Sequence, residues 1–322
     1  MRFAPRFLAL LAASLIGASS AFAQAYPNKP VKWVIPFAPG SATDQIGRAF
    51  AAKVSETLGQ PIVVDNKPGV NGMLGAAEVA KAPPDGYTIL IGTNSTNAAL
   101  KSLMKKLPYD QDTAFAPVAF MGQVPLIVAV NNDVPAKTLK EFVDLAKARP
   151  GTVTFASAST SQLVSSEMLA SMAGVQMTNV PYKSGPADMT DLIGGQVNMF
   201  TADFAVMLPQ VQGGKVRGLA VTSSKRSPAV PNLPTVNEAL GLKDYELIAY
   251  FAAFAPAGTP PEIVNRLNQA INAAATSKEI VDRFAPIGFQ PEPGTPQALQ
   301  QRTTAETAKW AKAIRDAKIE PQ

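Results

Sequence analysis

The stretch "IPFAPGSATD", residues 35–44, decides the first part of the fold. The apolar run that leads into it, at 31–37, is typical of a buried strand, and Pro36 and Pro39 end that pattern. Gly40 and small residues follow, and a helical pattern begins at Thr43 and Asp44. A helix start leaves N–H groups without internal partners, and such groups bind anions. The stretch therefore predicts a strand, an anion-holding loop and a helix.

The order of strand and helix repeats along the chain. The next helical pattern, at 44–59, ends in Gly59. Further strand-like runs are rich in β-branched or aromatic residues; they lie at 61–66, 87–93, 152–158, 175–182, 196–202 and 215–223. Alternating strands and helices predict an α/β protein with a mostly parallel sheet that has helices on both faces.

Two apolar runs are longer than an average strand and too weakly amphipathic for a helix. They cover residues 118–130 and 245–256. Two strands that each leave one domain and enter another would produce them. The predicted organisation is a discontinuous domain 1 (24–123 and 249–322) joined by a two-strand hinge to domain 2 (124–248). An ordinary long buried strand in one large sheet is the alternative.

The N-terminus has the pattern of a secretory signal peptide. Arg2 and Arg6 flank a short apolar run, and Ala21-Phe22-Ala23 is a small-x-small cleavage pattern. We expect cleavage near Ala23, which makes 1–23 the signal peptide and leaves an exported, soluble chain in the periplasm. An uncleaved membrane anchor is the alternative.

Composition excludes several kinds of chemistry. The chain has no Cys and no His, so it contains no thiol nucleophile, no Ser–His pair and no His metal site. The segment 40–44 is not a phosphate-binding P-loop, because no Lys follows at the required spacing. Loss of the signal peptide takes the formal charge from +5 to +3, and no basic run is interleaved with aromatic residues. We expect no nucleic-acid partner, and the mild positive charge favours encounter with anionic solutes.

A second loop repeats the design of the first. The segment "SASTSQ", 157–162, follows a strand-like run and precedes the helical pattern at 163–172. Ordinary helix capping by Ser and Thr explains any one of these residues. Two such loops in two domains favour an arrangement in which they face each other across a cleft.

Several segments together resemble a known family. They are "YPNKPVKWVIPFAPGSATD" (26–44), "VVDNKPGVNGMLGAAEVAKAPPDGYTIL" (63–90), "VPYKSGPADMTDLIGGQVNMF" (180–200), "GGKVRGLAVTSSKR" (213–226), "LPTVNEA" (233–239) and "APAGTPPEIVNRLNQAI" (255–271). In this order they are similar to the extracytoplasmic receptors of tripartite tricarboxylate transporters, the Bug family. The resemblance covers essentially the whole chain after the signal peptide.

The resemblance implies a type II periplasmic binding-protein (Venus flytrap) fold and carboxylate binding through backbone N–H groups, small side chains and waters. The ligand-binding residues that it implies come from three segments. They are Ala38, Gly40, Ser41, Ala42, Thr43 and Asp44 in the first loop, Ser159, Thr160 and Ser161 in the second, and Asp203. An acid at the last position suits a ligand amine, a hydroxyl or a water better than a bare carboxylate.

Three positions depart from the usual pattern of the family. Ser41 stands where a second glycine is common, Leu163 where many members have a His, and Ser184 where a Gly is frequent. The ligand of any one relative therefore does not transfer to this chain. Leu163 suggests a more apolar distal side, which would suit an aromatic or a longer aliphatic acid.

These observations predict a monomeric periplasmic solute-binding protein. We expect it to capture a di-, tri- or aromatic carboxylate in an interdomain cleft and to deliver it to the membrane components of a tripartite tricarboxylate transporter. We expect no catalytic residues, no metal and no cofactor. Two alternatives remain, which are a carboxylate-sensing adaptor for a two-component sensor kinase and an exported hydrolase.

Overall fold

The computed structural model describes residues 26–182 and 185–321. The predicted cleavage site at Ala21-Phe22-Ala23 and the family departure at Ser184 lie outside these ranges. Within them, no helix combines the length and the apolar character that a membrane crossing needs.

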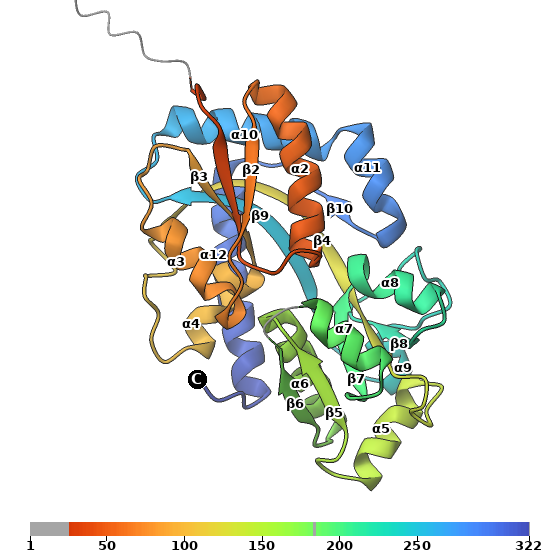
Figure 1. Cartoon of the computed structure of the whole chain (residues 1–322). Helices are drawn as coiled ribbons and strands as arrows, with labels where there is room; N and C mark the ends of the chain where they lie inside the picture. Colours follow the sequence, from red (N-terminus) through yellow and green to blue (C-terminus); the bar gives the residue numbers. More distant parts are fainter. Residues whose placement is uncertain (1–25, 183–184, 322) are drawn as a thin grey trace, which may run out of the picture.

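The first lobe contains the N-terminal strands and the return strand from the second lobe (Figure 1). Its sheet has the order β2-β1-β3-β9-β4, and β10 pairs with β4. The bounds of these strands are β1 (Val31–Ile35), β2 (Ile62–Asn66), β3 (Thr88–Thr93), β4 (Phe115–Val130), β9 (Ile248–Pro256) and β10 (Gln290–Pro291).

The second lobe continues from the far end of β4. Its sheet has the order β4-β7-β5-β6, and β8 also pairs with β4. The bounds are β5 (Thr154–Ser157), β6 (Thr178–Pro181), β7 (Met199–Asp203) and β8 (Arg217–Val221).

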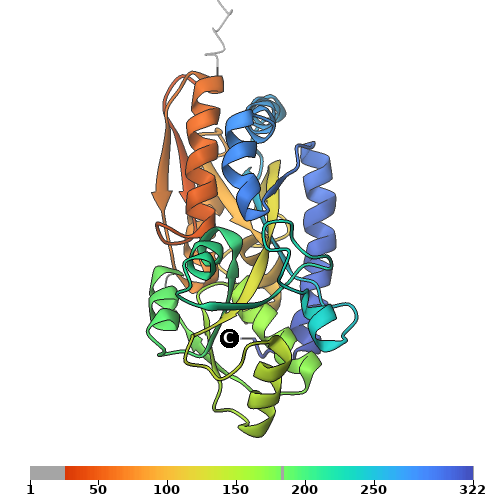
Figure 2. The same cartoon turned by 90° about the vertical axis from the view of Figure 1, so that its right-hand side faces the viewer.

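Strand β4 belongs to both sheets. It pairs with β9 from Phe115 to Pro125, and from Leu126 onward it pairs with β7 and β8 instead. Figure 2 shows β4, in yellow, running from the upper lobe into the lower one. Together β4 and β9 form a two-strand hinge. The change of partner after Pro125 lies close to the predicted domain boundary at 123/124, which itself stays a prediction.

The expectation of a mostly parallel sheet is wrong. The pairs β1–β2, β1–β3, β5–β6 and β5–β7 are parallel. Every antiparallel pair in the described chain includes β4 or β9. The reason is that β4 leaves the first lobe and β9 returns to it, so the two hinge strands run in opposite directions through the middle of the fold.

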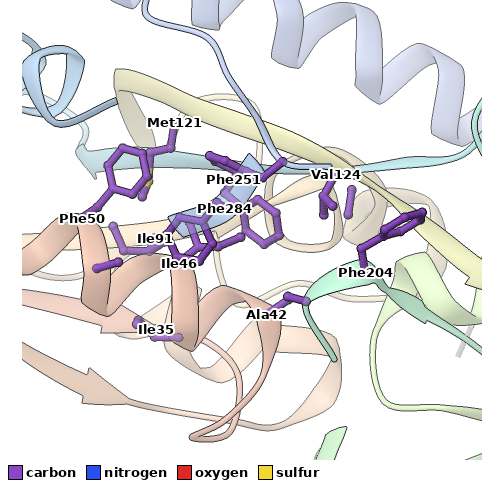
Figure 3. Packing of buried hydrophobic residues seen from close by; sticks show 14 of the residues in the cluster. Ile35, Ala42, Ile46, Phe50, Ile91, Met121, Val124, Phe204, Phe251 and Phe284 are labelled. Carbon is purple, nitrogen blue, oxygen red and sulfur yellow. The ribbon is translucent and has the colours of Figure 1, made fainter. Parts of the chain in front are cut away.

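The first sheet is covered by helices on both faces, and alternate strand residues pack against different helices. Trp33 and Ile35 pack with α2 (Ala42–Leu58) and α10 (Pro261–Ala275) on one face. Figure 3 shows part of this cluster, in which Ile46 and Phe50 of α2 pack together with Met121, Phe251 and Phe284, and Phe204 of the second lobe lies at its edge. On the other face, Val34 packs with residues of α3 (Met73–Ala80) and α12 (Pro296–Asp316). Side chains of successive strand residues point to opposite faces, which explains the division.

The remaining helices complete the two lobes. Their bounds are α4 (Leu100–Leu103), α5 (Leu139–Ala148), α6 (Thr160–Ala173), α7 (Gly185–Ile193), α8 (Phe204–Gln212), α9 (Val236–Leu240) and α11 (Lys278–Phe284), with short η segments at Val70–Gly72, Ser95–Ala99 and Ala285–Ile287. The long α12 reaches the second lobe, where its end contacts α6 (Figures 1 and 2).

Candidate functional site

A cleft lies between the lobes, where β1 and β3 of the first lobe and β5 and β7 of the second reach their carboxyl ends. The cleft holds about 600 Å³ of space not filled by atoms, part of it open to solvent. It is lined by Phe37, Ala38, Ser41, Ala42, Thr43, Thr93, Asn94, Ser95, Ala158, Ser159, Ser161, Gln162, Phe200, Asp203, Val206, Ala249 and Phe251. Ligands of α/β sheets commonly bind at this end of the strands.

The first wall of the cleft is the start of α2. Ser41 caps the helix, and its hydroxyl accepts a hydrogen bond from the Asp44 N–H at 3.2 Å. The N–H groups of Ala42 and Thr43, in the first turn, have no acceptor within the described part of the chain. Since both residues line the cleft, this helix end can offer two donors and the positive end of its dipole to an anion.

Asp44 holds this loop together and does not line the cleft. Its carboxylate accepts hydrogen bonds from the Gly40 N–H (2.9 Å), the Arg48 Nε (2.8 Å) and the Asn66 Nδ2 (2.9 Å). Burial raises the pKa of Asp44, but these hydrogen bonds and the Arg48 charge outweigh burial and hold the pKa below its ordinary value. The carboxylate is therefore satisfied within its own lobe.

Gly40 also stands apart from the lining. Its N–H is engaged by Asp44, and its φ of +84° is a left-handed conformation that favours glycine. A Cβ at this position would lie 3.8 Å from the Cγ of Pro186, at the start of α7 in the other lobe. The structure gives Gly40 a role in the turn and at the contact between the lobes.

The second wall is the start of α6. Ser159 and Gln162 form a reciprocal capping box, in which Gln162 Oε1 accepts from the N–H groups of Ala158 and Ser159. The N–H groups of Thr160 and Ser161 have no acceptor among the described residues. Ser159 and Ser161 line the cleft, whereas Thr160 is fully buried and its Oγ1 has no hydrogen-bond partner.

Asn94 connects the two walls, and our sequence reasoning missed it. The Ser161 hydroxyl lies 3.4 Å from Asn94 Oδ1, and Asn94 Nδ2 donates to the Ile248 carbonyl at 2.8 Å. Its neighbours Thr93 and Ser95 line the cleft with buried hydroxyls that have no partner. The signal was present in the sequence, because the polar run at 93–96 follows a buried strand just as the two predicted loops do.

Asp203 is the charged side chain of the lining. It ends β7 and stands at the N-cap position of α8, but its side chain makes no capping hydrogen bond, and its Oδ1 is buried without a partner. Burial raises its pKa to about 7. Asp188 of α7 is fully buried, whereas Asp203 is only partly buried; burial, with the charges of Asp203 and Asp191, raises the pKa of Asp188 to about 8.

The rest of the lining is largely apolar. Phe37, Phe200, Phe251, Val206 and Ala249 supply it. Leu163 does not: it is 7% exposed and packs in the core of the second lobe, so the expectation that it shapes the distal side of the cleft is wrong. The lining contains no Lys or Arg, and the described residues contain no cluster of three acidic side chains that could hold a metal ion.

The ten residues expected at the site therefore divide into two groups. The structure brings Ala38, Ser41, Ala42, Thr43, Ser159, Ser161 and Asp203 together in the lining. It places Gly40, Asp44 and Thr160 just behind it. The arrangement can hold an anion by neutral donors from two helix ends, one in each lobe, and it adds a single acidic group on the second lobe.

Comparison with known proteins gives a consistent result. The family model described as "Tripartite tricarboxylate transporter family receptor" matches residues 46–319. Protein BugT of Bordetella pertussis is 37% identical over 298 residues, which cover 91% of each chain. A structure of an R. palustris protein with adipate has 35% identity and a TM-score of 0.89, covering 92% of this chain and all of that one. MatC from Rhodopseudomonas palustris with bound malate has 33% identity and a TM-score of 0.85, covering 90% and 100%.

The structure of the periplasmic binding protein BugD agrees over the same extent, with 33% identity and a TM-score of 0.88, covering 92% of this chain and all of that one. These matches extend over both lobes and the hinge, so they support the two-domain Venus flytrap fold as well as the family. The chain belongs to the family of tripartite tricarboxylate transporter receptors, which are periplasmic substrate-binding proteins.

Proposed function

We propose that this receptor captures an organic carboxylate between the starts of α2 and α6, and delivers it to the membrane components of a tripartite tricarboxylate transporter. The observation that carries the proposal is the pair of helix N-termini that line one cleft from opposite lobes. The carboxylates bound by the adipate and malate relatives support the same ligand class.

Neutral donors suit a receptor that must also release its ligand. N–H groups at a helix start, together with the helix dipole, stabilise a carboxylate without a Lys or Arg partner. Hydrogen bonds to a charged group are each worth about 1.5–3 kcal/mol, so a few of them give useful affinity. The proposed ligand contacts are Ala38, Ser41, Ala42, Thr43, Ser159, Ser161 and Asp203, with Asn94 added. Gly40, Asp44 and Thr160 support the two loops.

The two-strand hinge gives this site a way to open and close. We propose that domain 1 comprises 24–123 and 249–322, that domain 2 comprises 124–248, and that the ligand bridges them. We also propose that the chain is exported as a monomer after cleavage near Ala23. Mass spectrometry of the exported protein should find a mature N-terminus near Gln24, and an intact Met1 would contradict this.

We propose that the protein binds its ligand without catalysing a reaction. The chain has no His and no Cys, and the family is one of receptors, so we expect the ligand to be recovered unchanged after prolonged incubation. Chromatography of the ligand before and after incubation measures this directly. A product that accumulates with time would favour the exported hydrolase. The family assignment likewise favours transport over a sensor adaptor.

A thermal-shift screen of mono-, di-, tri- and aromatic carboxylates tests the ligand class. A ligand at one hundred times its dissociation constant stabilises the folded state by about 2.7 kcal/mol. We therefore expect a clear rise in melting temperature for at least one acid, and no rise for its uncharged amide. If all acids in the screen leave the melting temperature unchanged, the carboxylate function is wrong.

A further inference from the structure

Among the described residues, the cleft lining combines many neutral hydrogen-bond donors with one acidic side chain and no basic one. Neutral N–H and hydroxyl donors come from the two helix starts, and the charged side chain of the lining, Asp203, is an acid. Asp203 Oδ1 is buried without a hydrogen-bond partner. Asp188 is 0% exposed; its Oδ1 accepts from the Met189 N–H at 2.7 Å, and its Oδ2 has no partner. Two carboxylates, each with one buried oxygen that has no partner, therefore lie in the same lobe, and the partly buried Asp203 faces the cleft.

The described surroundings offer these two acids no cation. On α7, Asp191 is the other charged residue, and its Oδ2 accepts from the Tyr182 hydroxyl at 2.6 Å. On α2, which contacts α8, Arg48 pairs with Asp44 at 2.8 Å. The Lys53 ammonium of α2 pairs with Glu56 at 2.6 Å. Among the other elements with the more extensive contacts to α7 or α8, which are β4, β5, β7 and the η segment 285–287, Asp203 is the charged residue.

A carboxylate oxygen that is buried without a donor is costly, because it loses its hydration without gaining a hydrogen bond. Two remedies exist. The acids can take up a proton, or a cation from outside can pair with them. The lining favours pairing with an external cation, because aromatic rings attract positive charge as well as apolar surface. These rings belong to Phe37, Phe200 and Phe251.

We infer that the preferred ligand is a carboxylate that also bears an ammonium group, with its carboxylate at the two helix starts and its ammonium group at Asp203, supported by Asp188. This inference rests on the proposed carboxylate function and deepens it. Asp203 is then the specificity-determining residue of the cleft, and Asp188 is a positioning residue that adds negative charge behind it. A ligand with a second carboxylate in place of the ammonium group would be repelled by the negative charge of Asp203.

A series of acids that differ only at the distal group tests the inference. For each chain length from one to five methylenes, the ω-amino acid is compared by calorimetric titration with the dicarboxylate and with the simple fatty acid of equal length. One such set is 5-aminopentanoate, adipate and pentanoate. We expect the amino acid to bind at least about tenfold more tightly than both partners at its best length.

Two variants and a control locate the effect. Asp203→Asn should weaken the best amino acid about ten- to hundredfold, as expected for a charge-assisted hydrogen bond, while pentanoate binding is kept and thereby shows that the fold is intact. Asp188→Asn should cost a smaller factor. Asp191→Asn is the control, because it removes one negative charge from α7, the helix that carries Asp188. Asp191 accepts from the Tyr182 hydroxyl, so this variant should bind the amino acid as tightly as the wild type does.

The pH dependence of binding affinity distinguishes protonation of Asp203 from pairing of Asp203 with a ligand cation. An ionised Asp203 is needed to bind ammonium, so affinity for the amino acid should rise from pH 5 to pH 8. A protonated Asp203 that donates to a second carboxylate would give the opposite slope with adipate. If adipate binds and the amino acids bind no better than the fatty acids, the inference is overturned and the carboxylate function stands. If none of the three classes binds, both are wrong.

Discussion

Ser161 and Asn94 meet across the cleft, with 3.4 Å between the hydroxyl oxygen of one and the amide oxygen of the other. Asn94 belongs to the first lobe and Ser161 to the second. The amide nitrogen of Asn94 donates to the carbonyl of Ile248, the first residue of hinge strand β9. The Asn94 side chain therefore contacts both the second lobe and the hinge strand. A ligand that binds beside Ser161 can influence the two lobes and the hinge through this side chain.

Removal of one hydroxyl from the site should have a moderate effect. Ser161→Ala or Thr43→Ala deletes a side-chain donor while the backbone N–H groups remain. A hydrogen bond is worth about 0.5–1.5 kcal/mol, or up to about 3 kcal/mol with a charged partner, which predicts a two- to hundredfold loss of affinity. Calorimetric titration measures it. Ser171→Ala, on the same helix but bonded to the Asp316 carbonyl, is the control and should bind as the wild type does.

Substitution of Gly40 should disturb binding through the backbone. Gly40→Val places a branched residue at a φ of +84°, which displaces the turn before α2 and the contact with Pro186. We expect binding to be abolished and the fold to be largely retained. Gly59→Val, at the other end of α2, has a φ of +69° with nothing within 4 Å, so it should cost stability but spare affinity. Equal affinities for the two variants would refute this role of Gly40.

The stability contributed by Asp44 should depend on pH. Its folded-state pKa is lowered, so its contribution is fully present above the ordinary pKa of about 3.9 and is lost as the pH falls through the folded-state value. Asp44→Asn should therefore destabilise the protein at pH 7 by about 1–3 kcal/mol, nearer the low end because Arg48 is half exposed. Urea unfolding of both proteins at pH 7 and pH 3 checks this. A difference that does not shrink at pH 3 would contradict it.

Ligand should draw the lobes together. The lobes are joined by β4 and β9, and the two proposed anion-binding loops lie one on each side of the cleft. Small-angle scattering should show a smaller radius of gyration at saturation with a ligand confirmed by calorimetry. The same titration with a non-binding amide is the control, and an unchanged radius would indicate a rigid protein.

Local patterns account for much of the fold and of the cleft lining. The strand, loop and helix at 31–58 follow from apolar periodicity, from two prolines and from a serine cap, all of which act over short distances. The same short-range signals predict the loop at 157–162. Six of the ten expected site residues line the cleft because both loops follow buried strands; the seventh, Asp203, is expected from the family resemblance.

Other features depend on contacts that no local pattern encodes. The position of β9 between β3 and β4 follows from pairing between distant segments. Leu163 belongs to the core because the face of α6 on which it lies packs on the second sheet and not on the cleft. Asp188 is polar and lies in a helix of mixed pattern, so its full burial appears only once α7 packs on β5 and β7.

The sheet order of the first lobe has a consequence for how the chain folds. The strand between β3 and β4 in this sheet, β9, begins more than one hundred residues after the end of β4, because the whole second lobe lies between them. As the exported chain emerges on the periplasmic side with its N-terminus first, β3 and β4 have edges that lack their partner β9, whereas the second lobe already has all of its own strands. We therefore expect the inserted lobe to gain structure first and the N-terminal lobe to depend on chaperones until residue 256 has emerged.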